Sequence, residues 1–411
     1  MTTILHICDW YHPIGGAEKL LFDTLKLLED EGHTNIVAYN DNPNQKPSGL
    51  RPEYACTGLE SWEYHNPKNI VSAKRAIKAV EKIIKKHSPD ICHIHNFQNS
   101  YVTEYLISRM PCVRSIHDPR LYCFTNWKLL PDRSICPYPL GEDCITQGCI
   151  TKSRLPQNGF ENNARWVIRN FEVHKKMSVL IAESRRQIEC MLDNGFQPEQ
   201  IAWLPNFTPV RSEQEVEQFL QEHFNPKEKI VLFVGRASYE KGAQVLLDAC
   251  QYLKSKCKVV IIAAGPLLGE LRLQASKYAG LVEVIPGLSY EETRKYYARS
   301  SIVIIPSVWL ENFCLVGLEA FENKKPVIGS RIGGIQDWLK EPETGWFFEP
   351  GNAQSLAEKI DLAMANPERL QEMGKAAYER VRKYYNSGVY IARLLEIYQR
   401  GIKAYKKGNC S

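Results

Sequence analysis

The sequence lacks the short motifs by which many nucleotide-binding enzymes are recognised. No two glycines are separated by a single residue, which excludes the Gly-x-Gly-x-x-Gly loop of dinucleotide-binding enzymes. The phosphate-binding loop that ends in Gly-Lys-Ser/Thr is missing as well, because Gly374-Lys375 is followed by alanine. No Asp-x-Asp pair is present to hold a divalent cation on a diphosphate. A diphosphate ligand would have to be neutralised by other side chains.

Excess charge and long apolar runs are missing too, and we expect no leader segment. The 52 Lys+Arg and 47 Asp+Glu residues leave a formal net charge of +5 without a block of either sign, so we expect no nucleic-acid partner. No apolar run approaches the ~18 residues that span a bilayer. Asp9 interrupts the first apolar run before an export signal forms. The odd number of cysteines, 13, is typical of reduced thiols, and we expect a cytoplasmic protein.

Short apolar runs alternate with amphipathic segments along most of the 411 residues, the pattern of parallel sheets with helical crossovers. Buried strands are predicted at 4–8, 36–39, 91–94, 112–116, 178–182, 230–234, 258–262, 282–284, 302–305 and 326–328. A polar segment over 206–229 separates the two series. The prediction is an α/β protein with two doubly wound, Rossmann-like domains, over 1–207 and 208–388, followed by a last helix within 389–411. Ligands of such sheets bind at the carboxyl ends of the strands, so we expect one central cleft.

Two cations follow the first predicted strand of the second domain. Arg236 and Lys241 lie five residues apart in a loop that Gly235 and Gly242 flank, before a helix. Arg binds phosphate oxygens bidentately, Lys acts as a mobile point charge, and the helix dipole adds to both. The loop is a candidate diphosphate site; the alternative is a pair of solvated surface charges.

A second candidate site follows the predicted strand at 302–305. Glu311 lies in the loop after this strand, and Glu319 lies about one turn into the next helix. The backbone amides of Asn312, Phe313, Cys314 and Leu315 would then lie at a helix N-terminus, where phosphate or sugar hydroxyls bind. Glu319 suits a pair of vicinal hydroxyls such as those of a ribose. The alternative is a carboxylate that only complements the helix dipole.

Nine of the ten histidines precede residue 211, so any imidazole chemistry is expected from the first domain. His117 follows the predicted strand at 112–116, at the same edge where Gly15 and Gly16 follow the first strand. Paired glycines let a backbone approach a ligand closely. His117 is a candidate contact for a sugar hydroxyl, although a single histidine is more often structural.

A series of motifs along nearly the whole chain matches one family in order and residue type. The motifs are Gly15-Gly16-x-Glu18, Pro89-Asp90-x-x-His93-x-His95, His117-Asp118, Gly235-Arg236 with Lys241-Gly242, Ala264-Gly265-Pro266, Glu311-x7-Glu319, Gly333-Gly334 and Thr344-Gly345. They resemble the GT-B, family 4 retaining glycosyltransferases. The sequence departs from the family's usual pattern at two positions that bear on the identity of the sugar. Cys314 stands where a glycine is frequent, and Asp337 stands where a glutamate is usual.

The resemblance implies transfer of a sugar from a nucleotide-diphosphate sugar, a UDP- or GDP-sugar, to an acceptor hydroxyl of a glycan, a lipid-linked glycan or a small molecule. It implies retention of anomeric configuration and no metal cofactor. The first domain would be the acceptor side, and the last helix would pack back on it. Arg236 and Lys241 would hold the diphosphate and Glu319 the ribose. Glu311 would contact the donor sugar, and His117 would face it from the other domain.

The candidate site residues fall into two sets. The catalytic candidates are His117, Arg236, Lys241 and Glu311, and the donor-binding candidates are Gly15, Gly16, Asn312, Phe313, Cys314, Leu315 and Glu319.

Four cysteines cluster within a predicted loop at 120–155, close after His117. Cys123, Cys136, Cys144 and Cys149 offer the four thiolates of a structural zinc site. Their spacing lacks the tight Cys-x2-Cys pairs of zinc motifs, so free thiols and disulfides stay open as alternatives.

A basic segment over 74–86 suggests a further partner. Its cations are Lys74, Arg75, Lys78, Lys82, Lys85 and Lys86, with Glu81 the only opposing charge. Related enzymes with lipid acceptors dock on anionic membranes through such patches, so peripheral contact with the inner face of a membrane is one prediction. A solvated helix face that covers a sheet is the alternative.

Two other functions are compatible with the sequence. A sugar-nucleotide epimerase on the same architecture would need acid and base groups beside the sugar, and the lack of histidine after His223 disfavours it. A non-catalytic nucleotide-sugar-binding protein would need only the donor-binding residues. The presence of both His117 and Glu311 favours an enzyme.

Overall fold

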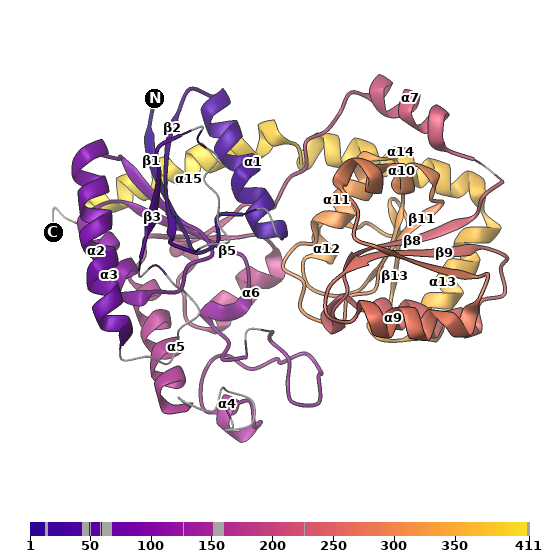
Figure 1. Cartoon of the computed structure of the whole chain (residues 1–411), viewed down its shortest axis with the longest axis horizontal. Helices are drawn as coiled ribbons and strands as arrows, with labels where there is room; N and C mark the ends of the chain where they lie inside the picture. Colours follow the sequence, from indigo (N-terminus) through magenta and orange to yellow (C-terminus); the bar gives the residue numbers. More distant parts are fainter. Residues whose placement is uncertain are drawn as a thin grey trace. The chain divides into compact units, whose positions relative to one another are not determined.

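The computed structural model describes residues 1–12, 15–42, 49, 51–57, 59, 68–125, 127–150, 160–225 and 227–408. Residues 126 and 151–155 of the predicted cysteine-rich loop and 409–411 of the last predicted segment lie outside this set. The chain divides into two compact units, Met1–Pro205 with Tyr390–Ser411 and Asn206–Val389, called unit 1 and unit 2 below. Each contains a parallel sheet with flanking helices (Figure 1).

Unit 1 has a sheet of seven strands in its described residues, in the order β3-β2-β1-β4-β5-β6-β7. All neighbours pair in parallel. The strands are β1 (Thr3–Cys8), β2 (Thr34–Asn40), β3 (Glu53–Cys56), β4 (Ile91–Ile94), β5 (Cys112–Ile116), β6 (Val179–Ala182) and β7 (Ile201–Trp203). The central strands are buried along their length, as expected of a parallel sheet that is covered on both faces.

The longer helices of unit 1 flank this sheet, whereas the four-residue α4 (Asp143–Thr146) has no buried residue. The longer helices are α1 (Gly16–Asp30), α2 (Lys68–His87), α3 (Ser100–Arg109), α5 (Phe160–Lys175), α6 (Arg185–Asp193) and most of α15 (Ser387–Gly408). In α1 the leucines at 20, 21, 25 and 28 are buried, which is the helical spacing of an apolar face. The chain returns to unit 1 at Tyr390, and α15, in yellow, lies along the sheet (Figure 1).

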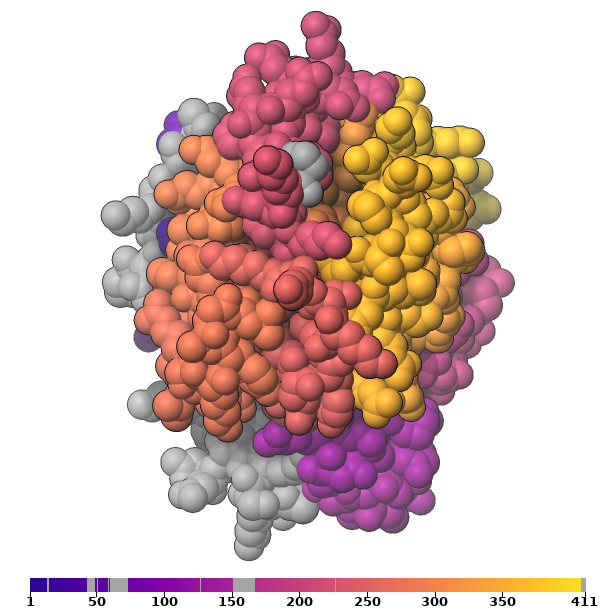
Figure 2. All heavy atoms as spheres, turned by 90° about the vertical axis from the view of Figure 1, so that its right-hand side faces the viewer, coloured from indigo at the N-terminus to yellow at the C-terminus, as the bar shows by residue number. Residues whose placement is uncertain are grey.

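Unit 2 repeats the architecture with six strands in its described residues, in the order β10-β9-β8-β11-β12-β13. They are β8 (Ile230–Arg236), β9 (Lys258–Ala264), β10 (Val282–Pro286), β11 (Ile302–Ile305), β12 (Val327–Ser330) and β13 (Gly345–Phe348). The helices are α7 (Glu213–His223), α8 (Ala243–Ala249), α9 (Leu268–Ala275), α10 (Tyr290–Arg299), α11 (Leu315–Glu322), α12 (Ile335–Trp338), α13 (Ala353–Ala365) and α14 (Pro367–Tyr384). Figure 2 shows α13, in yellow, beside the red segment near residue 250. The two parallel α/β sheets confirm the predicted fold class.

Candidate functional site: the strand ends of each unit

The loops after β8 and β11 meet at the carboxyl edge of the sheet in unit 2. Gly242 has a left-handed backbone with φ of 72°, and a Cβ there would overlap the carbonyl oxygen of Pro306. Only glycine fits such a close approach without strain. The approach brings the Lys241 ammonium to 2.7 Å from the Glu311 carboxylate. The two predicted loops therefore contact each other.

Lys241 and Glu311 form a partly buried ion pair. Their side chains are 24% and 4% exposed, and the Ser307 hydroxyl donates a further hydrogen bond of 2.7 Å to Glu311 Oε1. Burial alone would raise the pKa of Glu311, but the charge of Lys241 and these hydrogen bonds outweigh it, so the pKa is lowered. Burial opposes the charge on Lys241, and Glu311 more than compensates, so the pKa of Lys241 is raised. Both groups carry their charges at neutral pH.

The backbone that carries Glu311 is held by a glycine pair and a tryptophan. A Cβ at Gly333 or Gly334 would overlap the backbone of residues 311–313, so two glycines are needed for the chains to lie this close. Gly334 donates its amide to the Glu311 carbonyl at 2.7 Å. The indole of Trp338, fully buried, donates to the Phe313 carbonyl at 2.7 Å. These contacts fix the loop that precedes α11.

Cys314 occupies a left-handed position at the N-terminus of α11, with φ of 73° and ψ of 85°. This region favours glycine, and a side chain there carries strain of about 1–3 kcal/mol. Burial and the neighbouring Glu311 raise the pKa of the thiol to about 12, so it is protonated at neutral pH. Leu315 is the first residue of α11.

Glu319 and Arg236 differ in how they are held. Tyr297, fully buried, donates its hydroxyl to Glu319 Oε2 at 3.1 Å, which positions the carboxylate. Arg236, the last residue of β8, is 57% exposed and lies 3.9 Å from Glu240 Oε1. The sequence did not predict Tyr297 and Glu240 as partners. Tyr297 lies in a helix and Glu240 in a loop, and neither segment carries a motif that indicates a site.

In unit 1, the loops after β1, β4 and β5 are linked by hydrogen bonds at the carboxyl edge of the sheet. Gly15 precedes α1, and Glu18 accepts a hydrogen bond of 3.4 Å from the Asn96 amide. Arg120 donates to Asn96 at 2.7 Å and pairs with Asp118 at 2.6 Å. The predicted loop residues Gly15, Gly16 and His117 all lie at this edge.

His117 has a carboxylate partner that sequence reasoning missed. Its Nδ1 lies 2.6 Å from Glu183 Oε1, and the two side chains are 4% and 7% exposed. His117 directly follows β5 and Glu183 directly follows β6. The only signal in the sequence was a glutamate at the end of a predicted strand.

A cluster of three buried histidines has metal-ligand character. Ligand atoms of His6, His93 and His95 lie within 4.8 Å of one another, the one such group of three in the described residues. However, His93 uses one nitrogen for Tyr398 at 2.8 Å and the other for Ser115 at 2.9 Å. His6 Nδ1 and His95 Nε2 are hydrogen-bonded at 3.1 Å. The contacts describe a hydrogen-bond network that ties α15 to the sheet.

The four cysteines of the predicted loop are buried or, for Cys144, half-buried. No three of their sulfur atoms lie within 4.8 Å of one another in the part of the chain that the structure describes. Cys136 lies 3.7 Å from the ammonium of the buried Lys128. The structural zinc site stays a prediction, which metal analysis of the purified protein tests: bound zinc supports it, and metal-free folded protein contradicts it.

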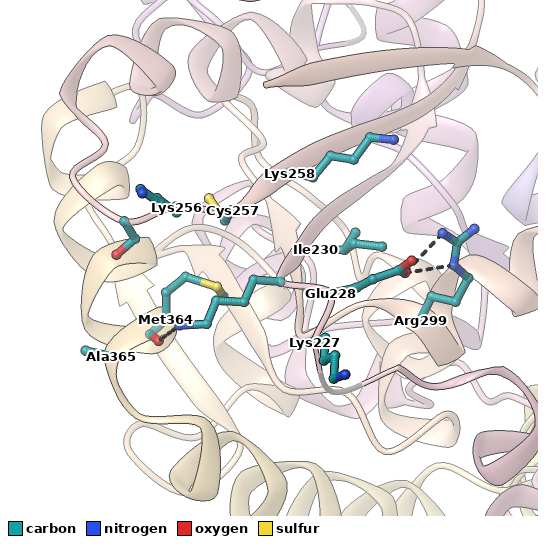
Figure 3. Close-up of a pocket in the computed structure, with 11 residues that line it drawn as sticks. Lys227, Glu228, Ile230, Lys256, Cys257, Lys258, Arg299, Met364 and Ala365 are labelled. Atoms are coloured by element: carbon teal, nitrogen blue, oxygen red, sulfur yellow. Dashed lines mark hydrogen bonds and ion pairs between the residues drawn. The ribbon is translucent and has the colours of Figure 1, made fainter. Parts of the chain in front are cut away.

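A pocket of about 680 Å³ lies at the opposite edge of unit 2, where β8 and β9 begin (Figure 3). The ion pair of Glu228 with Arg299 lies on one side of it, and Lys229 donates to the Met364 carbonyl. None of the candidate site residues lines this pocket. It is therefore separate from the donor-site candidates.

Two models of glycosyltransferase families match consecutive parts of the chain: "Glycosyltransferase Family 4" over residues 14–211 and "Glycosyl transferases group 1" over 215–380. Sucrose-phosphate synthase from Thermosynechococcus elongatus has a similar structure, with a TM-score of 0.75 and 18% identity over 98% of this chain and 100% of that one. HepE of Anabaena, in complex with UDP and glucose, gives a TM-score of 0.70 at 18% identity over 96% and 99%. The chain belongs to the GT-B glycosyltransferases and resembles their family 4.

Sequence similarity to individual relatives covers less than half of the chain. Sulfoquinovosyl transferase SQD2 of Arabidopsis thaliana is 30% identical over 183 residues, 44% of this chain and 35% of that protein. A lipopolysaccharide 1,2-N-acetylglucosaminetransferase of Salmonella typhimurium is 32% identical over 168 residues, 38% of this chain and 44% of that protein. The matches thus span less than half of these relatives. Of the helices described, none is both long and apolar enough to cross a membrane.

Proposed function

We propose that this protein transfers a sugar from a nucleotide-diphosphate sugar to an acceptor hydroxyl, with retention of anomeric configuration. The observation that carries the proposal is the Lys241–Glu311 pair, which joins the loops after β8 and β11 at the edge where such sheets bind ligands. HepE, a protein of the same fold, has been crystallised with UDP-glucose, which supports a UDP-sugar donor. A GDP-sugar is the other donor to test.

In this proposal, Lys241 and Arg236 stabilise the negative charge that develops on the leaving diphosphate. Preorganised cations and amides act strongly in a site from which water is excluded. Glu311 keeps Lys241 charged and oriented, Glu319 receives the ribose hydroxyls, and the amides of 312–315 contact the donor.

The bond between the anomeric carbon and the diphosphate oxygen breaks, and the acceptor oxygen bonds to the same face of that carbon. The acceptor proton moves to the leaving phosphate, so no protein nucleophile and no divalent cation is required. His117 is proposed to contact the transferred sugar.

The test is incubation with UDP-, GDP- and ADP-sugars, with release of nucleoside diphosphate and transfer to added acceptors as readouts. Turnover that persists in excess chelator, with a product of unchanged anomeric configuration by NMR, supports every part of the proposal. Binding of nucleotide sugars without turnover would instead favour the non-catalytic binding protein. Membrane docking through 74–86, whose cations are exposed on α2, stays a prediction for vesicle binding assays.

A further inference from the structure

Glu183 and His117 are brought together by the register of two neighbouring strands. β5 and β6 run parallel, with Ile116 opposite Ala182, so the next residues of the two strands, His117 and Glu183, emerge side by side. The Nδ1 to Oε1 distance is 2.6 Å, and both side chains are nearly buried. A short, buried contact between an imidazole and a carboxylate is stronger than a neutral hydrogen bond.

The identity of the partner decides which nitrogen of His117 carries a proton. An ionised carboxylate only accepts hydrogen bonds, so Nδ1 must donate. A neutral imidazole has one N–H, and its other nitrogen, Nε2, then carries a lone pair. The ring would therefore offer a hydrogen-bond acceptor at Nε2.

The surroundings hold this pair in place. Gln187 accepts from the Glu183 amide at 2.7 Å and donates to the Ile116 carbonyl at 2.7 Å, so one side chain bridges the ends of both strands. The His95 ring lies parallel to His117, at 6.0 Å between centroids and 7° between planes. Burial lowers the pKa of His95 well below its usual value, so this neighbour is neutral.

We propose that Glu183 is a positioning residue that holds His117 in the Nδ1–H tautomer, so that Nε2 accepts a hydrogen bond from a hydroxyl of the sugar substrate. The sugar contact rests on the proposed glycosyltransferase function. The tautomer does not, because it belongs to the protein without substrate.

The tautomer is measured directly by NMR of the full chain with 15N-labelled histidine. A His117→Gln variant identifies the resonances of this ring. We expect a protonated Nδ1 and an unprotonated Nε2 in the wild type, and loss of that signature in Glu183→Met. A ring with Nε2 protonated, or an unchanged signature in Glu183→Met, would overturn the proposal even if the protein transfers no sugar.

Kinetics separate positioning from a merely structural role. Glu183→Met is expected to lower kcat by about 10- to 100-fold, the value of a hydrogen bond to a charged group, with the donor KM within about threefold. Glu183→Gln supplies an amide oxygen as acceptor and should recover part of both kcat and the tautomer signature. The matched control is Glu172→Gln, an exposed carboxylate in the same unit, with no expected change. Loss of kcat in Glu183→Met that Glu183→Gln does not recover would contradict the proposal.

Discussion

The site edge of unit 2 carries a charged pair on loops that glycines bring together, whereas the sheet of unit 1 buries three imidazoles in a hydrogen-bond network. Lys241 and Glu311 keep their charges through each other. His6, His93 and His95 are kept neutral by burial. Unit 2 therefore holds a pair of opposite charges at its site edge, whereas unit 1 holds uncharged imidazoles inside its sheet.

The glycines that follow strands in the two units also differ in what a side chain at their position would contact. A Cβ at Gly334 would overlap the backbone of Asn312, which cannot move without the whole loop. A Cβ at Gly15 meets only the end of the Glu18 side chain, at 2.8 Å, and that side chain can rotate. A side chain at Gly334 would thus force the backbone of unit 2 to shift, whereas one at Gly15 would displace only the Glu18 side chain.

The largest expected difference between the units is the loss of stability at acid pH. Burial lowers the pKa of His6 to about 4, and it also lowers the pKa values of His93, His95 and His174 well below their usual range. As pH falls below about 6.5, these groups take up protons in the unfolded state before the folded one, so folding is disfavoured. For His6 the cost is about 2 kcal/mol at pH 5, and the other three act in the same direction.

The only histidine of unit 2 is His223, which makes unit 2 an internal control for this effect. Hydrogen exchange at pH 7 and pH 5, corrected for intrinsic rates, should show loss of protection in unit 1 first. Equal losses in both units would contradict this comparison.

The next effect is expected from Lys241→Ala, which should lower turnover by about 10²- to 10³-fold because a preorganised charge is lost. It also leaves Glu311 buried without its cation, so the free energy of unfolding should fall by about 3 kcal/mol. The double variant Lys241→Ala with Glu311→Gln should regain stability but not turnover. If the double variant regains both, the charge is not part of catalysis.

Gly334→Ala should lower the free energy of unfolding by about 3 kcal/mol, because the loop at 311–313 must shift. Gly15→Ala is the matched change in unit 1 and should cost less than about 1 kcal/mol, since only the Glu18 side chain must move. Chemical denaturation, followed separately in each unit, measures the free energy of unfolding of both variants. Equal costs would contradict the difference between Gly334 and Gly15.

The smallest expected effect is a gain in stability. Cys314→Gly should raise the free energy of unfolding by about 1 kcal/mol, because the left-handed backbone at this position favours glycine. Thermal unfolding measures the change, with Cys250→Ala, a buried thiol of the same unit outside the site, as a destabilised control. A loss of stability on Cys314→Gly would mean that thiol packing outweighs the backbone strain.

The sequence predicted the long apolar strands because buried parallel strands are almost continuously apolar. It missed β3 and β7, which are short strands at the ends of their sheet, and β13, whose Gly-Trp-Phe-Phe follows a turn. The loops of Lys241 and Glu311 were predicted separately, because spacing along one chain does not show that Gly242 lets them touch. Glu183 and Tyr297 were missed since a pairing across strands or helices has no local sequence signal.

The most direct test of the central claim is the affinity of UDP and GDP for two variants that both lack the Glu311 carboxylate: Glu311→Gln and the Lys241→Ala, Glu311→Gln double variant, measured by calorimetry. If Lys241 binds the diphosphate, loss of its ammonium should raise Kd at least about tenfold for the preferred nucleotide. Equal Kd values in the two variants would contradict the assignment of this edge of unit 2 as the donor site.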